Sequence, residues 1–177
     1  ANFGNLTALE NLNLEGNALM SIPAAVFTMT SLKHLNLRNN RLDSLPSSIG
    51  SLTQLTVLDL QNNYGLRTLP SQIGNLSLLA ELYAGQSSMT SLPVSIGNCT
   101  HLTKLDLSDN ELASLPAAIG NLVDLKWFSV YGNRLTQLPS TFCNCTKVEY
   151  LDISFNLLTS LPDNIGKLTL LINLEAR

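Results

Sequence analysis

Leucine and polar positions alternate along this chain in a unit that returns every 23 residues. The unit follows the pattern L-x-x-L-x-L-x-x-N-x-L-x-x-L-P-x-x-I-G-x-L-x-x, and the intervals between the seven prolines are 23, 24, 23, 23, 23 and 23 residues. In the L-x-L segment apolar and variable residues alternate, which is typical of a strand with its leucines on one face. One such strand per unit, each paired with the next, predicts a parallel sheet.

The repeats fill the whole chain and predict a single domain over residues 1–177. Residues 1–8 form a partial repeat with Phe3, Gly4 and Leu6, and residues 171–177 form a partial repeat at the other end. We number the complete units one to seven and call the closing partial repeat unit eight. The complete units begin at Leu9, Leu32, Leu55, Leu79, Leu102, Leu125 and Val148.

The other recurring positions predict the turns between the strands. An Asn recurs at positions 17, 40, 63, 110, 133 and 156, and its amide can bond to the backbone of the turn that ends each strand, so we expect a buried ladder of asparagines. In L-P-x-x-I-G, the Pro suits the first position of a helical turn, and the Gly is expected to end that turn in a left-handed conformation. The outer side of each unit is therefore one short helical or 3-10 turn, which predicts a gently curved arc.

This pattern resembles the typical 23-residue class of the leucine-rich-repeat superfamily. The L-P-x-x-I-G-x-L segment is similar to the subgroup found in Ras-pathway scaffold proteins, plant intracellular Ras-group-related proteins and Roco-type kinases. The resemblance covers essentially the whole chain. It implies an α/β fold, a right-handed solenoid in a horseshoe arc, with the parallel β-sheet on its concave face and short turns on its convex face. It also implies that the concave sheet binds protein partners.

Units three and four depart from the pattern. Unit three has one extra residue near Tyr64 and Gly65, and in unit four Ala84 and Ser87 replace the second strand leucine and the ladder asparagine. Met89 and Cys99 replace further core leucines of unit four. One interpretation is drift absorbed by repacking, and the other is an irregularity that presents Tyr64, Tyr83 and Gly85 to a ligand. We expect unit four to be the weakest part of the solenoid.

Composition and motifs argue against several function classes. Charged residues make up 13% of the chain and the net charge is −3, so the basic stripe of a nucleic-acid binder is missing. No apolar run approaches the ~18–20 residues of a spanning helix. There is no phosphate-binding loop, nucleophile elbow or zinc-type cysteine spacing. We therefore expect no enzyme activity, no cofactor, no metal, no nucleic acid and no membrane insertion.

The ends and the N-x-S/T sequons leave the cellular setting open. Neither end has a recognisable cap, although repeat arrays need terminal units with a polar outer face. We expect missing flanking segments, and a monomer unless the uncapped ends stack. The sequons are either incidental to the G-N-L consensus, which favours a cytoplasmic protein, or glycan sites of a secreted or cell-surface protein. They lie at Asn5, Asn75, Asn98 and Asn144.

The variable strand positions predict where a partner binds. Aromatic residues gather in units six and seven, on strands ~4.8 Å apart, and binding hot spots are enriched in Trp, Tyr and Arg. The aspartates beside them favour a partner that brings Lys or Arg. Alternatively, Trp127 packs over Lys104 or Tyr150 and shields the sheet. The candidate partner-binding residues are Trp127, Tyr131, Tyr150, Phe155, Tyr83, Lys104, Asp106 and Asp152.

These observations favour a non-enzymatic module that binds a protein on its concave sheet, as a signalling scaffold or recognition domain. The first alternative is a glycosylated fragment of a secreted or cell-surface receptor ectodomain. The second is a structural segment that assembles with itself through its ends.

We predict that the three cysteines of the chain form no intramolecular disulfide. Cys99 and Cys145 occupy one core position two units apart, which separates them by roughly 9.6 Å, whereas a disulfide needs Cα atoms within ~7 Å. Cys143 is too close to Cys145 in sequence to bridge easily. Thiol titration in denaturant without reductant should find three free groups, and a count of one would contradict the register.

Overall fold

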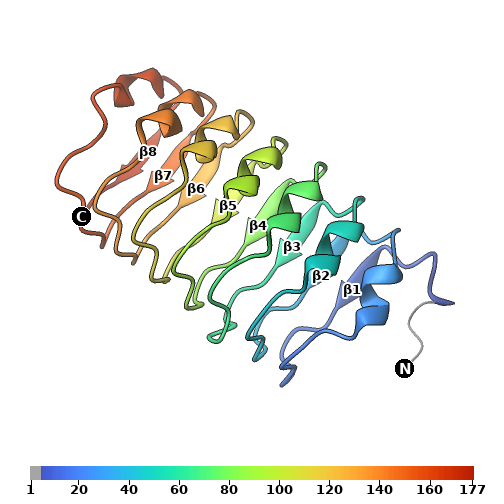
Figure 1. Ribbon diagram of the computed structural model, residues 1–177. Helices are drawn as coiled ribbons and strands as arrows, with labels where there is room; N and C mark the ends of the chain where they lie inside the picture. The colour runs from blue at the N-terminus through green and yellow to red at the C-terminus, as the bar shows by residue number, and fades with distance from the viewer. Residues whose placement is uncertain (1–4) are drawn as a thin grey trace.

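The computed structural model describes residues 5–177, which form one sheet of eight parallel strands in chain order (Figure 1). Equivalent positions of consecutive units pair directly, as Leu35 does with Leu58 and Leu82 with Leu105. The predicted parallel sheet is thus confirmed, and Phe3 and Gly4 of the first partial repeat lie outside the described residues. The strands are β1 (Asn11–Asn13), β2 (His34–Asn36), β3 (Val57–Asp59), β4 (Glu81–Tyr83), β5 (Lys104–Asp106), β6 (Trp127–Ser129), β7 (Tyr150–Asp152) and β8 (Asn173–Glu175).

Short 3-10 helices follow the strands along the opposite, convex side of the solenoid (Figure 1). In most units the helix begins one residue after the Pro, whose carbonyl accepts the first bond of the turn, as Pro46 does from the amide of Ile49 at 3.0 Å. The predicted convex turns are confirmed. The helices are η2 (Ala24–Thr28), η3 (Ser47–Ser51), η4 (Ser71–Asn75), η5 (Val94–Asn98), η6 (Ala117–Asn121), η7 (Ser140–Asn144) and η8 (Ile165–Lys167).

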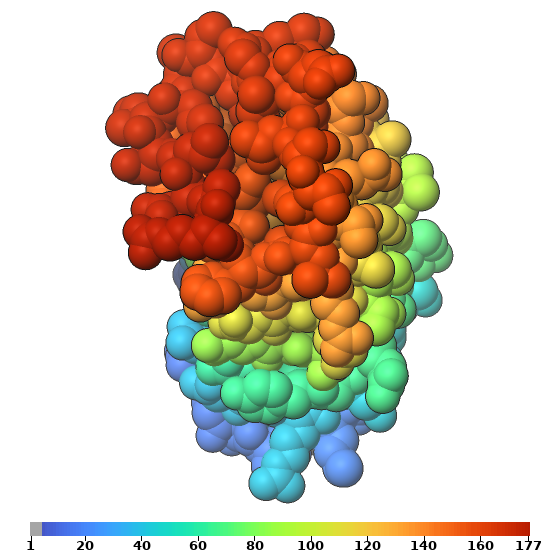
Figure 2. All heavy atoms as spheres, turned by 90° about the vertical axis from the view of Figure 1, so that its left-hand side faces the viewer, coloured from blue at the N-terminus to red at the C-terminus, as the bar shows by residue number. Residues whose placement is uncertain are grey.

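The core lies between the sheet and these helices. In the middle units the inward strand leucines are fully buried, as at Leu105. The apolar residue three positions after each Pro is also fully buried, as at Ile119. The end units are less covered: Leu174 of β8, the equivalent of the fully buried Leu151, is 43% exposed. Seen from that end, the atoms of units seven and eight form the front of the molecule (Figure 2).

The recurring Gly of the convex turn has a different role from the one expected. Among the described residues, the glycines with positive φ are Gly16 and Gly132. The glycines of the convex turns are therefore not left-handed: Gly50, Gly74, Gly97 and Gly120. Instead these glycines let neighbouring turns approach closely. A Cβ on Gly120 would lie 2.2 Å from the carbonyl oxygen of Thr141 in the next turn. The missing side chain therefore sets how tightly the convex side packs.

The asparagine ladder is confirmed and joins adjacent units. The amide nitrogen of Asn110 donates to the carbonyls of Leu107 in its own unit, at 3.0 Å, and of Ala84 in the preceding unit, at 2.9 Å. Its Oδ1 accepts the backbone N–H of Met89 at 2.9 Å. Asn40, Asn63, Asn133 and Asn156 make the same contacts. Each side chain thus pairs buried polar backbone atoms that would otherwise lack partners.

Ser87 interrupts the ladder, and the extra residue of unit three compensates for it. The Ser87 hydroxyl lies 3.5 Å from the carbonyl oxygen of Gly85 and makes no bond to unit three. In other units the amide equivalent to that of Leu66 donates to the Oδ1 of a ladder asparagine, which Ser87 does not provide. In the lengthened loop of unit three, the Leu66 amide donates instead to the carbonyl of Asn63 at 2.9 Å. Ser88 also donates to the carbonyl of Tyr64 at 2.8 Å. The two departures of units three and four are therefore one coupled rearrangement.

The three cysteines are free and buried, as the register predicts. Cys99 and Cys145 each direct the thiol toward a carbonyl of a neighbouring turn, those of Ile73 and Ile119, both at 3.3 Å. Burial raises the pKa of the Cys99 thiol to about 11 and that of Cys145 to about 12, so both remain protonated at neutral pH.

We predict that Asn110→Ala destabilises the solenoid much more than Asn17→Ala. Asn110 is buried, and its loss leaves the Met89 amide and the Ala84 carbonyl unpaired, at a cost of about 3 kcal/mol in free energy of unfolding. Asn17 bonds to the exposed turn of unit one, where water replaces it, so its loss should cost about 1 kcal/mol or less. Urea denaturation of both variants measures the difference, and equal losses would contradict the role of the ladder.

Candidate binding face

The concave sheet presents two variable side chains per strand on either side of a buried central residue. In β7, Tyr150 and Asp152 are half-buried while Leu151 is fully buried. Because the strands are in register, equivalent side chains of neighbouring strands lie next to one another. The face is therefore composed of columns that run across the strands.

Three aromatic rings and a lysine lie in a row across β4 to β7, with Lys104, Trp127 and Tyr150 in one column and Tyr83 in the neighbouring column. The ring of Trp127 stacks on that of Tyr150, with centroids 5.1 Å apart and planes at 2°. On the other side of Trp127, the Lys104 ammonium lies 4.7 Å from the indole centroid and 5.0 Å from the ring of Tyr83. These are the contacts that shield the sheet in the alternative interpretation, and they leave Trp127 half-buried. Four predicted site residues thus form one continuous row.

A second aromatic pair lies where β6 and β7 end. Tyr131 and Phe155 meet edge to face, with ring centroids 5.1 Å apart, and Phe155 remains 61% exposed. The backbone of Phe155 has φ 53°, a left-handed conformation that is strained for a bulky residue. The equivalent positions of the other units also have positive φ, and they hold glycine or polar residues, so Phe155 is the one bulky apolar residue of the series: Gly16, Asn39, Asn62, Gln86, Asp109 and Gly132.

The two predicted aspartates differ in their availability. Oδ1 of each accepts the backbone N–H two residues on, that of Ser108 or Ser154, at 3.0 Å. Asp106 is only 8% exposed, and its Oδ2 accepts a bond from Gln61 at 2.9 Å. Asp152 is half-buried, and its Oδ2 has only the hydroxyl of Tyr150 at 3.5 Å. Asp152 therefore has a free acceptor on the face, and Asp106 does not.

The structure adds neighbours of Asp152 that the sequence analysis did not include. Glu175 of β8 and Arg177 lie beside Asp152, and together with Tyr131, Tyr150, Ser154 and Phe155 they line a hollow of about 200 Å³. Burial raises the pKa of the Tyr150 hydroxyl, and the charges of Asp152 and Glu175 raise it further. Continuing the 23-residue register into unit eight would have placed Glu175 in the column of Asp152.

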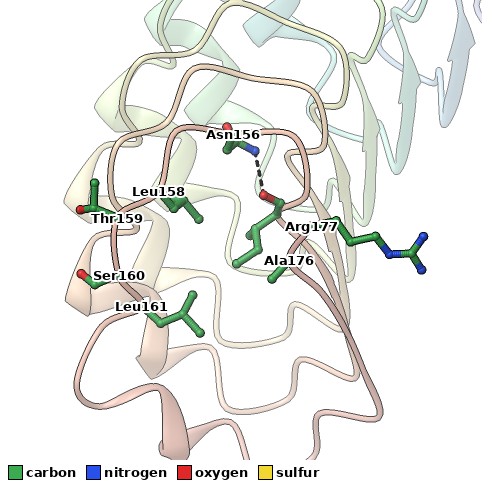
Figure 3. A pocket seen from close by; sticks show the side chains of 8 residues that line it. Asn156, Leu158, Thr159, Ser160, Leu161, Ala176 and Arg177 are labelled. Atoms are coloured by element: carbon green, nitrogen blue, oxygen red, sulfur yellow. Dashed lines mark hydrogen bonds between the residues drawn. The ribbon is translucent and has the colours of Figure 1, made fainter.

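A larger cavity of about 410 Å³ opens at the end of the solenoid (Figure 3). Leu158 and Leu161 are core positions of unit seven and line it together with Ile153 and Ala176. The dashed line in Figure 3 is the ladder bond from Asn156 to the carbonyl of Ile153, at 3.0 Å. The cavity is thus bounded by core and ladder residues, on a different side from the aromatic face.

Between residues 5 and 177, no helix has the length and apolar character needed to cross a bilayer. The same part of the chain holds no cluster of three or more His, Cys, Asp or Glu side chains placed to bind a metal ion.

Comparison with known proteins identifies the family. A model described as "Leucine-rich repeat region" matches residues 26–109 and 94–177. The chain therefore belongs to the leucine-rich-repeat proteins. No curated protein matches it.

Solved structures with the same fold include bacterial and plant proteins. A leucine-rich-repeat protein of Leptospira interrogans is 31% identical with a TM-score of 0.82, over 99% of this chain and 50% of its own. The plant peptide hormone receptor RGFR1 in complex with RGF2 is 35% identical with a TM-score of 0.88, over 98% and 29%. The ectodomain of the receptor kinase GASSHO1/SCHENGEN3 from Arabidopsis thaliana, in complex with CASPARIAN STRIP INTEGRITY FACTOR 2, is 33% identical with a TM-score of 0.84, over 96% and 22%. This chain spans half or less of the length of each.

Proposed function

We propose that this chain is a non-enzymatic recognition module that binds a protein or peptide along its concave sheet, centred on units six to eight. The observation that carries the proposal is Phe155, a large apolar side chain held in a left-handed conformation and 61% exposed. Folding alone favours Asn or Gly at this position. Strain of this kind clusters at functional sites.

The rest of the face supports the same conclusion. Trp127 and Tyr150 already stack on each other in the free chain, which lowers the entropy lost on binding. Tyr131 and Phe155 line the same hollow as Tyr150, so the two aromatic pairs belong to one patch over β6 and β7. Exposed aromatic groups with a polar rim mark contact sites in proteins of this size.

A more specific candidate is a fragment of a secreted or cell-surface receptor ectodomain. Two similar structures are plant receptors in complex with named factors. The Asn side chains of all four sequons are exposed, and Asn75, Asn98 and Asn144 end helices of the convex side. Glycans there would leave the concave face free. A mass decrease of the native protein on endoglycosidase treatment would support this candidate, and an unchanged mass would contradict it.

We predict that Phe155→Asn separates binding from stability. The change relieves the left-handed strain and should raise the free energy of unfolding by about 1 kcal/mol. The same change removes an exposed anchor, so binding should weaken by about 2 kcal/mol, or roughly 30-fold. The ligands are peptides selected on the intact chain from a displayed random library, and urea denaturation gives the stability.

Val123→Ala is the matched control, because Val123 is also an exposed apolar residue but follows η6 on the convex side. It should leave peptide binding unchanged. Trp127→Ala should weaken binding as Phe155→Asn does. Peptides that bind all three variants as tightly as the original chain, or a library from which none is enriched, would contradict the proposed function.

A further inference from the structure

The hollow beside β7 and β8 combines features that suit one positively charged side chain. Its walls are Tyr131, Tyr150 and Phe155, and Asp152 and Glu175 supply two carboxylates. Its volume of about 200 Å³ is below the ~300–1,000 Å³ of pockets that enclose free small molecules. A single side chain of a larger partner therefore fits this hollow better than a small metabolite does.

We propose that this hollow is the specificity pocket of the binding face and takes an arginine side chain of the partner. The inference rests on the proposed function and names the chemistry of what is bound. Guanidinium groups stack on aromatic rings and bond to carboxylates in a planar fork, which lysine cannot do. The free Oδ2 of Asp152 and the carboxylate of Glu175 supply the acceptors, and the three rings supply the stacking surfaces.

The chain's own cations support this assignment. Arg177 lines the hollow, and its guanidinium pairs with Glu175 Oε2 at 3.0 Å while its side chain stays 77% exposed. On the neighbouring part of the face, Lys104 lies between the rings of Tyr83 and Trp127. With two carboxylates and one guanidinium at the hollow, one negative charge remains for a second cation.

The probe is a capped tripeptide, acetyl-Gly-Arg-Gly-amide, titrated into the isotopically labelled chain. Shifts of the backbone N–H signals of Ser154 and Phe155 report occupancy of the hollow by NMR. Replacing the arginine with citrulline keeps the shape and removes the charge, so affinity should fall about fivefold, the loss of one partly screened ion pair. Replacing it with lysine should weaken binding as well, because the planar stack is lost.

Asp152→Asn tests the carboxylate without disturbing the fold, in protein made in a host that does not N-glycosylate, because the change creates an N-x-S sequon with Ser154. Asn already occupies this register position at Asn13 and Asn36, where its Oδ1 accepts the same backbone N–H that Asp152 accepts. The variant should lose about fivefold in affinity for the arginine tripeptide. Asp59→Asn is the matched control, because it makes the same charge change in the same column four strands away and should have no effect.

Arg177→Ala should change the affinity for the arginine tripeptide in the opposite direction. If Arg177 competes for Glu175, its removal should tighten binding of the arginine tripeptide by about twofold or more. Equal binding of the arginine and citrulline tripeptides, or Asp152→Asn and Asp59→Asn behaving alike, would overturn the pocket. The tripeptide reports on the hollow alone, so this failure would leave the peptide selection, which tests the whole face, to decide the proposed function separately.

Discussion

Buried asparagine side chains hold neighbouring units of this solenoid together. The strands have only three residues each and therefore make few hydrogen bonds to one another. Without the asparagines, the turns that follow the strands would bury unpaired polar backbone atoms. Asn110 and its equivalents pair the amide and carbonyl groups of two units at once. The unit spacing, and hence the alignment of every surface column, depends on this contact. Where Ser87 breaks the series, a lengthened loop in unit three supplies the missing bond.

The fixed alignment of units is what creates the binding face. Side chains one unit apart lie at the spacing of adjacent strands, ~4.8 Å, which allows aromatic rings to stack and a lysine to insert between them. Trp127, Tyr150 and Lys104 use this spacing directly. Phe155 does not depend on this spacing. Its backbone has a strained left-handed conformation, and its ring is exposed on the face. We attribute that strain to recognition, since the equivalent positions of other units hold Gly or a polar residue (Asn, Asp or Gln).

Most of the architecture could be predicted from the 23-residue period, because the period fixes which residues align. The period does not fix how close two aligned segments come, so the role of Gly120 in close packing was missed and a left-handed turn was expected instead. The period also does not determine which hydrogen bonds the surface side chains make. Gly85, just after β4, leaves space that lets Gln61 reach Asp106, two strands away, and this bond removes Asp106 from the exposed face. The hollow at Glu175 is lined by seven residues from three units, and no single motif indicates it.

Trp127 is the only tryptophan of the chain and lies within the proposed face, so its fluorescence tests the central claim most directly. Acrylamide quenching should be measured on the free chain and again with a selected peptide at saturation, with peptide binding verified independently by fluorescence anisotropy. The half-buried indole should be quenched in the free chain and clearly protected in the complex. Equal quenching in both states would show that the partner binds elsewhere and would contradict the assignment of the concave face.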